Sequence, residues 1–139
     1  MKENMDMIAA GYAQMIVKGI EIQKQEEDDG LQKLRQAENH VTKSLGILQE
    51  NGLYAFFLYQ DVETVFGKRI SSCCRSLLEE QPIALLKSGD DFYKDLMALC
   101  SGLDRLFLAK ELIERVLVYA RYHLKAGRKK SNNPGGEMN

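Results

Sequence analysis

The chain has 139 residues, 45% of them hydrophobic, so it is long enough to close one core and too short for two domains of ordinary size. Its 19 Lys and Arg residues nearly balance its 20 Asp and Glu residues, which excludes a whole-molecule attraction to nucleic acid and leaves local basic patches for such binding. The near-neutral charge favours self-association. The three cysteines, two of them adjacent, indicate a reducing cytoplasm. The sequence shows no secretion signal, and no apolar stretch approaches the length that a membrane span requires.

Apolar residues at helical spacing predict a first amphipathic helix that ends before the acidic run 26–29, which with Gly30 is expected to form a solvated turn. Its inward face is predicted to comprise Met5, Ile8, Ala9, Tyr12, Met15, Ile16 and Ile20. A second helix is predicted from Leu31 to Gly52, where the glycine ends it. Its inward residues are Leu34, Val41, Leu45 and Leu48, and its outward residues are Lys33, Gln36, His40 and Lys43.

The almost fully apolar segment 53–60 predicts a short buried helix, followed by Asp61 as a cap for the next helix. That helix is expected to bury Val62, Phe66, Ile70, Cys73 and Leu77. It must stop before Pro82, and residues 83–86 are expected to add a single helical turn. A turn at 88–90 with an N-cap then opens a helix through Cys100, which Ser101 and Gly102 end.

A last helix is predicted from about Asp104 to Ala126, followed by a polar segment that contains a proline. The expected fold is therefore all-α, a compact bundle of about five to six helices. Residues 1–127 are expected to form a single helical-bundle domain, and residues 128–139 a basic, disordered C-terminal tail.

The last helix carries apolar residues on two faces. Leu108, Leu112 and Tyr119 point roughly 120° away from the main apolar face at 100° per residue. Two interpretations remain open: neighbouring helices surround a central helix, or the second face binds a protein partner.

Basic residues cluster at two places. Arg121, Lys125 and Arg128 follow at i, i+4 and i+7 along the last helix, and Lys68, Arg69 and Arg75 form a second, weaker group. Cations in the last turns of a helix offset its dipole, which is the plain structural interpretation. The alternative is phosphate contact, in which each cation adds a salt-dependent increment of affinity that is blind to sequence.

Little in the sequence indicates catalysis or a bound cofactor. The two histidines show no zinc-ligand spacing, the cysteines fit small core residues, and no Gly-rich phosphate loop or nucleophile elbow is present. The Arg35-x4-His40 spacing resembles the signature of HEPN-type helical ribonucleases, which implies attack by the RNA 2′-hydroxyl. Because five residues rotate the pair by roughly 140° around a helix, a joint site would require a dimer or a distorted helix. We expect that the chain is not an enzyme and binds no metal or cofactor. The alternatives to this expected function are the dimeric ribonuclease and a generic helical adaptor.

One pattern extends across nearly all of residues 1–127. An Ala-rich opening helix precedes Gly46-Ile47-Leu48, Asn51-Gly52-Leu53 and Ala55-Phe56-Phe57, and the last helix contains Glu111, Ile113, Val116 and Arg121-Tyr122. This pattern resembles the small helical subunit of the type III-B CRISPR effector, the Cmr complex. The family usually has a Trp in its last helix, where this chain has none.

The resemblance implies a compact bundle without catalytic activity that stacks in copies along other Cmr subunits. It further implies a scaffolding role in antiviral defence, with positive charge lining the groove where target RNA pairs with guide RNA. The implied partners are the other Cmr effector subunits and both RNAs, through phosphate contacts.

Overall fold

The computed structural model describes residues 2–25, 30–80, 83–87 and 89–132. Within these ranges the chain forms six α-helices and no β-strand, so the prediction of an all-α bundle is confirmed. The helices are α1 (Lys2–Gln25), α2 (Gly30–Asn51), α3 (Leu53–Val62), α4 (Thr64–Glu79), α5 (Phe92–Cys100) and α6 (Leu103–Asn132). In the described part of the chain, no helix combines the length and the apolar character that a membrane crossing requires.

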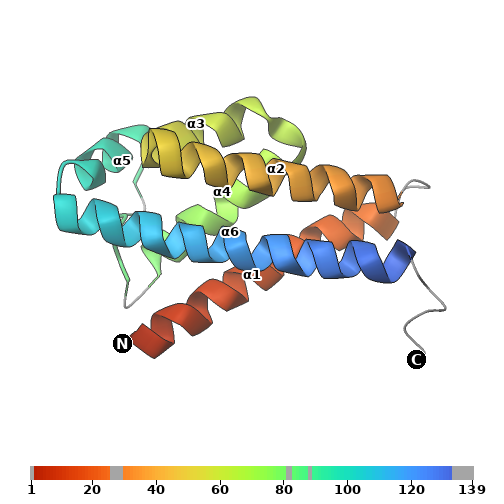
Figure 1. Cartoon of the computed structure of the whole chain (residues 1–139). Coiled ribbons are helices and arrows are strands. Elements are labelled where there is room, and N and C mark those ends of the chain that lie inside the picture. Colours follow the sequence, from red (N-terminus) through yellow and green to blue (C-terminus); the bar gives the residue numbers. More distant parts are fainter. Residues whose placement is uncertain (1, 26–29, 81–82, 88, 133–139) are drawn as a thin grey trace.

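The longest helix, α6, organises the bundle. It packs against α1 and α2 over much of its length and against α3 and α5 near its start. Figure 1 shows α2 and α6 side by side and antiparallel, with α1 crossing beneath α6. The remaining helices close the bundle, because α3 covers α2, and α4 packs against both α3 and α1.

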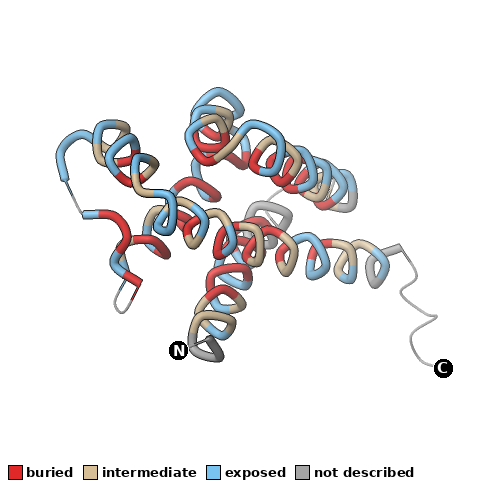
Figure 2. Tube along the Cα trace, turned by 60° about the vertical axis from the view of Figure 1, so that its left-hand side comes forward, coloured by how far each residue is buried: buried red, intermediate tan, exposed pale blue. Residues whose placement is uncertain are grey.

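One continuous core lies between these helices, and Figure 2 shows that the buried positions of each helix face inward. Its largest fully buried side chains are Phe56, Phe57, Ile16, Ile20, Leu34, Leu48, Leu53, Ile70, Leu77, Leu78, Leu96 and Leu99. The predicted inward faces are confirmed with two exceptions, since Met15 is 50% exposed and Val62 is 73% exposed. Val62 is the last residue of α3 rather than part of the α4 face.

Two glycines permit the tight path from α2 to α4. Gly52 has φ 98°, a conformation that favours glycine, and its N–H donates to the carbonyls of Ile47 and Leu48 at the end of α2. Gly67 allows α4 to lie directly against α3, because a Cβ atom at this position would lie 2.1 Å from the carbonyl oxygen of Gln60. The predicted helix end at Gly52 and the short helix after it are therefore confirmed, but α3 is buried on one side only, since Tyr54 is 37% and Leu58 44% exposed.

Several predicted helix boundaries are wrong. Asp61 lies inside α3 and accepts a hydrogen bond from the Tyr93 hydroxyl, while Glu63 occupies the cap position of α4 without a side-chain cap bond. Residues 83–86 form no helical turn, because the N–H groups of Leu85 and Leu86 both donate to the carbonyl of Leu78. The N-cap of α5 is Asp91, whose side chain accepts from the N–H of Lys94.

The end of the last helix also differs from the prediction. Because α6 continues to Asn132, the expectation of a disordered tail is wrong for residues 128–132. The rest of the predicted tail, residues 133–139, lies outside the described residues. The acidic turn predicted at 26–29 lies outside them as well.

Candidate nucleic-acid interface

Three of the six predicted phosphate-binding cations contact other parts of the bundle. The guanidinium of Arg128 forms an ion pair with Glu38 on α2, with 2.9 Å between Nε and Oε1. Arg69 packs over Gly19 and donates to the carbonyl of Met15, 3.4 Å away on α1. These two arginines therefore join helices of the bundle rather than project freely.

Arg75 is the third of these cations. Its guanidinium carbon lies 3.6 Å from the centre of the Phe92 ring, a cation–π contact between α4 and α5. Its Nε atom is buried without a hydrogen-bond partner in the described structure. Arg75 also lines a cavity of about 430 Å³ along α4 together with Lys68, the serines Ser71, Ser72 and Ser76, and the carboxylates Asp61 and Glu79. The two carboxylates weaken the attraction of this cavity for an anion.

The other three predicted cations remain available. Arg121 and Lys68 are exposed, Lys125 is half-buried, and none of them forms an ion pair within the described residues. Arg121 and Lys125 lie one turn apart on α6, next to the exposed side chain of Tyr122, which is 65% accessible. Lys68 lies on α4, and α1 packs between α4 and α6, so the two basic groups do not merge into one surface.

The predicted protein-binding face of α6 is mostly enclosed. Leu112 is only 1% exposed and belongs to the core, so it cannot contact a partner from the folded bundle. Leu108 and Tyr119 are half-buried, and the Tyr119 hydroxyl donates to Asp6 Oδ1 on α1 at 2.5 Å. Leu112 therefore fits the central-helix interpretation, whereas Leu108 and Tyr119 keep part of their surface exposed.

Exposed apolar side chains lie instead at the junction of α5 and α6, where Met97 is 62%, Leu103 64% and Phe107 56% exposed. These exposed positions were not predicted. Leu103 and Phe107 are one helical turn apart, which is the signal that could have identified them.

His40 is not the outward residue that its place in the sequence predicted. It is 9% exposed, and its ring stacks on Tyr59 of α3 with 5.2 Å between ring centres and an interplanar angle of 23°. The Phe66 ring of α4 lies at 5.9 Å on a tilted plane. Arg35 is exposed and does not line the cleft around His40, so the structure does not bring the predicted ribonuclease pair together.

A buried polar chain holds His40 in place. His40 Nε2 lies 2.8 Å from Oε1 of Gln60, and the amide nitrogen of Gln60 donates to Ser44 Oγ, also at 2.8 Å. In this arrangement the Gln60 amide nitrogen faces Ser44 and its oxygen faces the imidazole, which corresponds to the His40 tautomer with its proton on Nε2.

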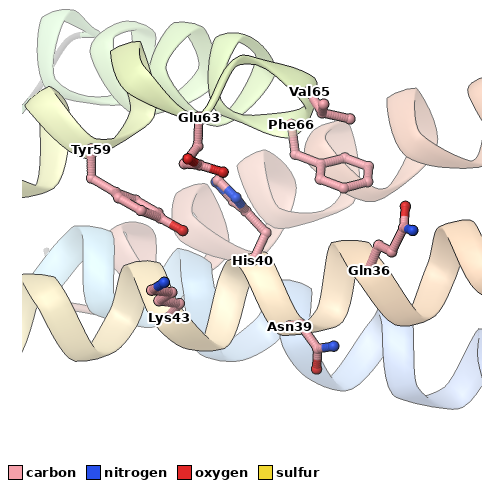
Figure 3. A pocket seen from close by; sticks show the side chains of 8 residues that line it. All are labelled: Gln36, Asn39, His40, Lys43, Tyr59, Glu63, Val65 and Phe66. Atoms are coloured by element: carbon pink, nitrogen blue, oxygen red, sulfur yellow. The ribbon is translucent and has the colours of Figure 1, made fainter.

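His40 borders an open cleft of about 290 Å³ between α2 and the turn that joins α3 to α4. Figure 3 shows His40 at its centre, flanked by the rings of Tyr59 and Phe66, with the Glu63 carboxylate above it. The lining comprises Gln36, Asn39, His40, Lys43, Tyr59, Glu63, Val65 and Phe66. Gln36, His40 and Lys43 share the side of α2 that the sequence predicts to face outward, whereas the opposite wall depends on the packing of α3 and α4.

Positive and negative charges meet at this cleft. The Lys43 ammonium lies 5.8 Å from the centre of the Tyr59 ring, and the Lys33 ammonium lies 5.8 Å from the centre of the Phe66 ring. Burial raises the pKa of the Tyr59 hydroxyl above its ordinary value, and the negative charge of Glu63 adds to the rise. Aromatic faces bordered by cations are the arrangement that proteins use to stack nucleic-acid bases.

The described residues contain no group of three or more His, Cys, Asp or Glu side chains that could hold a metal ion. The three cysteines are free thiols: Cys73 and Cys74 are buried and Cys100 is half-buried. No protein-family model, curated protein or solved structure matches the chain.

Proposed function

We propose that this chain is a non-catalytic, RNA-binding subunit of a cytoplasmic type III-B CRISPR effector, the Cmr complex. The observation that carries the proposal is the pair Arg121 and Lys125, which form no ion pair in the described structure, whereas Arg128 on the same helix is paired with Glu38. Because α6 continues to Asn132, both cations lie well before its last turn, so the helix dipole does not account for their positions. The pair is therefore better explained by a partner outside the chain that carries negative charge.

RNA phosphates match this pair in charge and in geometry. Successive cations along a helix can follow a backbone, and each contact releases counterions, which makes the affinity fall with salt. The all-α bundle agrees with the fold that the sequence resemblance implies. The exposed apolar side chains at Met97, Leu103 and Phe107 offer a surface for a neighbouring effector subunit or a second copy of this chain.

The dimeric ribonuclease has less support. His40 donates its Nε2 proton to Gln60, and Arg35 lies outside the cleft that His40 borders. A purified protein that cleaves RNA without metal, and that loses this activity in His40→Ala, would restore the ribonuclease. The same measurement therefore also tests the absence of catalysis in the effector subunit.

The first experiment is purification of the tagged chain from its native cells, with mass spectrometry of proteins and sequencing of RNA. Recovery of large Cmr-type subunits with short guide RNA is the expected result. Recovery of the chain alone, or with unrelated proteins only, would refute the effector proposal.

A second experiment tests the two cations directly in the purified protein. Arg121→Glu with Lys125→Glu should weaken binding to single-stranded RNA of any sequence and lower the slope of log affinity against log salt by about 1.4, for two phosphate contacts at about 0.7 each. The matched control is Lys87→Glu with Lys94→Glu, which changes the net charge equally at two other exposed lysines. An equal loss in both double variants would reveal only a general charge effect and would remove Arg121 and Lys125 from the proposal.

A further inference from the structure

The cleft around His40 has the size of a small ligand site. Its volume of about 290 Å³ lies at the lower limit of the roughly 300–1,000 Å³ that is usual for ligand pockets, which fits a single nucleobase better than a large cofactor. It opens between α2 and the start of α4, and Val65 at its mouth is 62% exposed. A flat, neutral ring can therefore enter the cleft from solvent.

The aromatic wall of the cleft is held rigidly. Tyr59 is half-buried, and its ring stacks on His40, which is fixed in turn by its hydrogen bond to Gln60. Figure 3 shows Tyr59 and Phe66 on either side of the imidazole. An aromatic side chain that is already fixed loses little freedom when a base stacks on it, which favours binding.

The charged groups of the cleft select the kind of base. Glu63 is exposed and its carboxylate makes no hydrogen bond or ion pair in the described structure, so both of its oxygens can accept from a ligand. Lys43, on the opposite wall, can donate. Guanine alone among the RNA bases presents two adjacent donors, N1–H and N2–H₂, to one carboxylate, together with the acceptors O6 and N7 for a lysine.

A phosphate would fit this cleft poorly, because Glu63 would repel it. The neutral base avoids this repulsion, while Lys43 in the lining of the cleft can attract a phosphate that flanks the base. The arrangement therefore favours a base that belongs to a strand.

We propose that the cleft between α2 and the α3–α4 turn binds one unpaired guanine base of a bound RNA strand, stacked on Tyr59 and hydrogen-bonded to Glu63. This inference rests on the proposed RNA-binding function. It adds a site with base preference to the phosphate contacts of α6, which carry none. The sequence specificity of RNA binding is usually read from such unstacked bases.

The test measures binding to four oligouridylates of equal length whose central position is guanine, adenine, uracil or an abasic ribose. The full-length protein is expected to bind the guanine strand about tenfold more tightly than the abasic strand, and more tightly than the adenine strand. Glu63→Gln is expected to abolish the preference for guanine over adenine. Tyr59→Leu is expected to reduce both purine strands to the affinity of the abasic strand.

Two matched variants control for charge and for aromatic loss. Glu50→Gln removes an exposed carboxylate elsewhere on α2, and Tyr54→Leu removes an exposed tyrosine of α3 that lies outside the cleft. Both should retain the guanine preference, and circular dichroism should show that all four variants are folded.

The outcomes separate this inference from the proposed function. Equal affinity for all four strands, with normal salt dependence, would overturn the guanine site and leave the phosphate contacts intact. A preference for adenine would overturn the assignment of Glu63. Binding of guanosine monophosphate in an NMR titration, without any RNA binding, would overturn both proposals and identify a free nucleotide as the occupant instead.

Discussion

Replacement of Gln60 by methionine should destabilise the protein through polar groups rather than through lost volume. Gln60 is 1% exposed and joins His40 to Ser44 by two hydrogen bonds of 2.8 Å. Methionine has a similar length and fills the same space, so little cavity results. The change leaves the Nε2–H of His40 and the hydroxyl of Ser44 without their partners.

The magnitude follows from these two groups. A buried donor or acceptor without a partner costs about 1–3 kcal/mol, and the Ser44 hydroxyl can turn to the carbonyl one helical turn before it. We therefore expect Gln60→Met to lower the free energy of unfolding by about 2–4 kcal/mol, chiefly through His40. For a chain of this size, the melting temperature should fall by about 10 °C.

Urea unfolding followed by circular dichroism measures this loss. Gln49→Met is the matched control, because Gln49 is exposed and makes one bond of 3.2 Å to Glu114, so its loss should stay within about 0.5 kcal/mol. The double variant Gln60→Met with His40→Leu should lose less stability than the sum of the two single losses. The reason is that it contains neither the imidazole nor the amide that each single variant leaves without a partner. A loss below about 0.5 kcal/mol for Gln60→Met, or strict additivity in the double variant, would refute the reasoning.

Three further predictions concern packing, ion pairing and pH. Gly67→Ala should lower the free energy of unfolding in urea by about 2–3 kcal/mol, because its Cβ would meet the α3 backbone. Gly11→Ala is the control, since open space surrounds Gly11, and it should stabilise α1 by about 0.5–1 kcal/mol. Arg128→Met should lower the free energy of unfolding by about 1–2 kcal/mol, because its partner Glu38 is largely buried. The loss should persist in high salt, and a loss that disappears in 1 M salt would show that the pair is a surface contact. Burial and the hydrogen bond to Glu80 raise the pKa of Tyr12 to about 12 from 10.0, so its stabilising effect is complete below pH 10 and is lost as the pH rises to about 12. Tyr12→Phe should flatten this alkaline decline in urea unfolding, and an unchanged pH profile would contradict the assignment.

The helices could be predicted because their signals are local. The apolar spacing of α2 and the glycine that follows it define both the inward face and the end of that helix, and Pro82 sets a limit for α4. The end of α6 could not be predicted in the same way. The polar residues beyond Ala126 continue the helix. One of them, Arg128, forms a hydrogen-bonded ion pair with Glu38, which lies 90 positions earlier in the sequence.

The candidate site depended on contacts that local spacing does not reveal. His40 has the polar character and the position of an outward residue, and it is buried only because α3 and α4 lie across that side of α2. Leu112 shows the opposite case, since its apolar character was evident from the sequence, but its spacing left open whether neighbouring helices or a protein partner cover it. Which side of a helix is covered depends on tertiary packing, and no single helix contains that information.

The position of α6 has a consequence for synthesis of the protein on the ribosome. The helix α1 is synthesised first, but α6, against which it packs, follows only after α2, α3, α4 and α5. The hydrogen bond between Tyr119 and Asp6, which are 113 positions apart, joins these two helices. Until the chain is complete to about residue 124, α2 and α4 can cover only part of the apolar face of α1, and the part that packs against α6 stays exposed. A nascent chain that stalls before α6 should therefore be a substrate for chaperones.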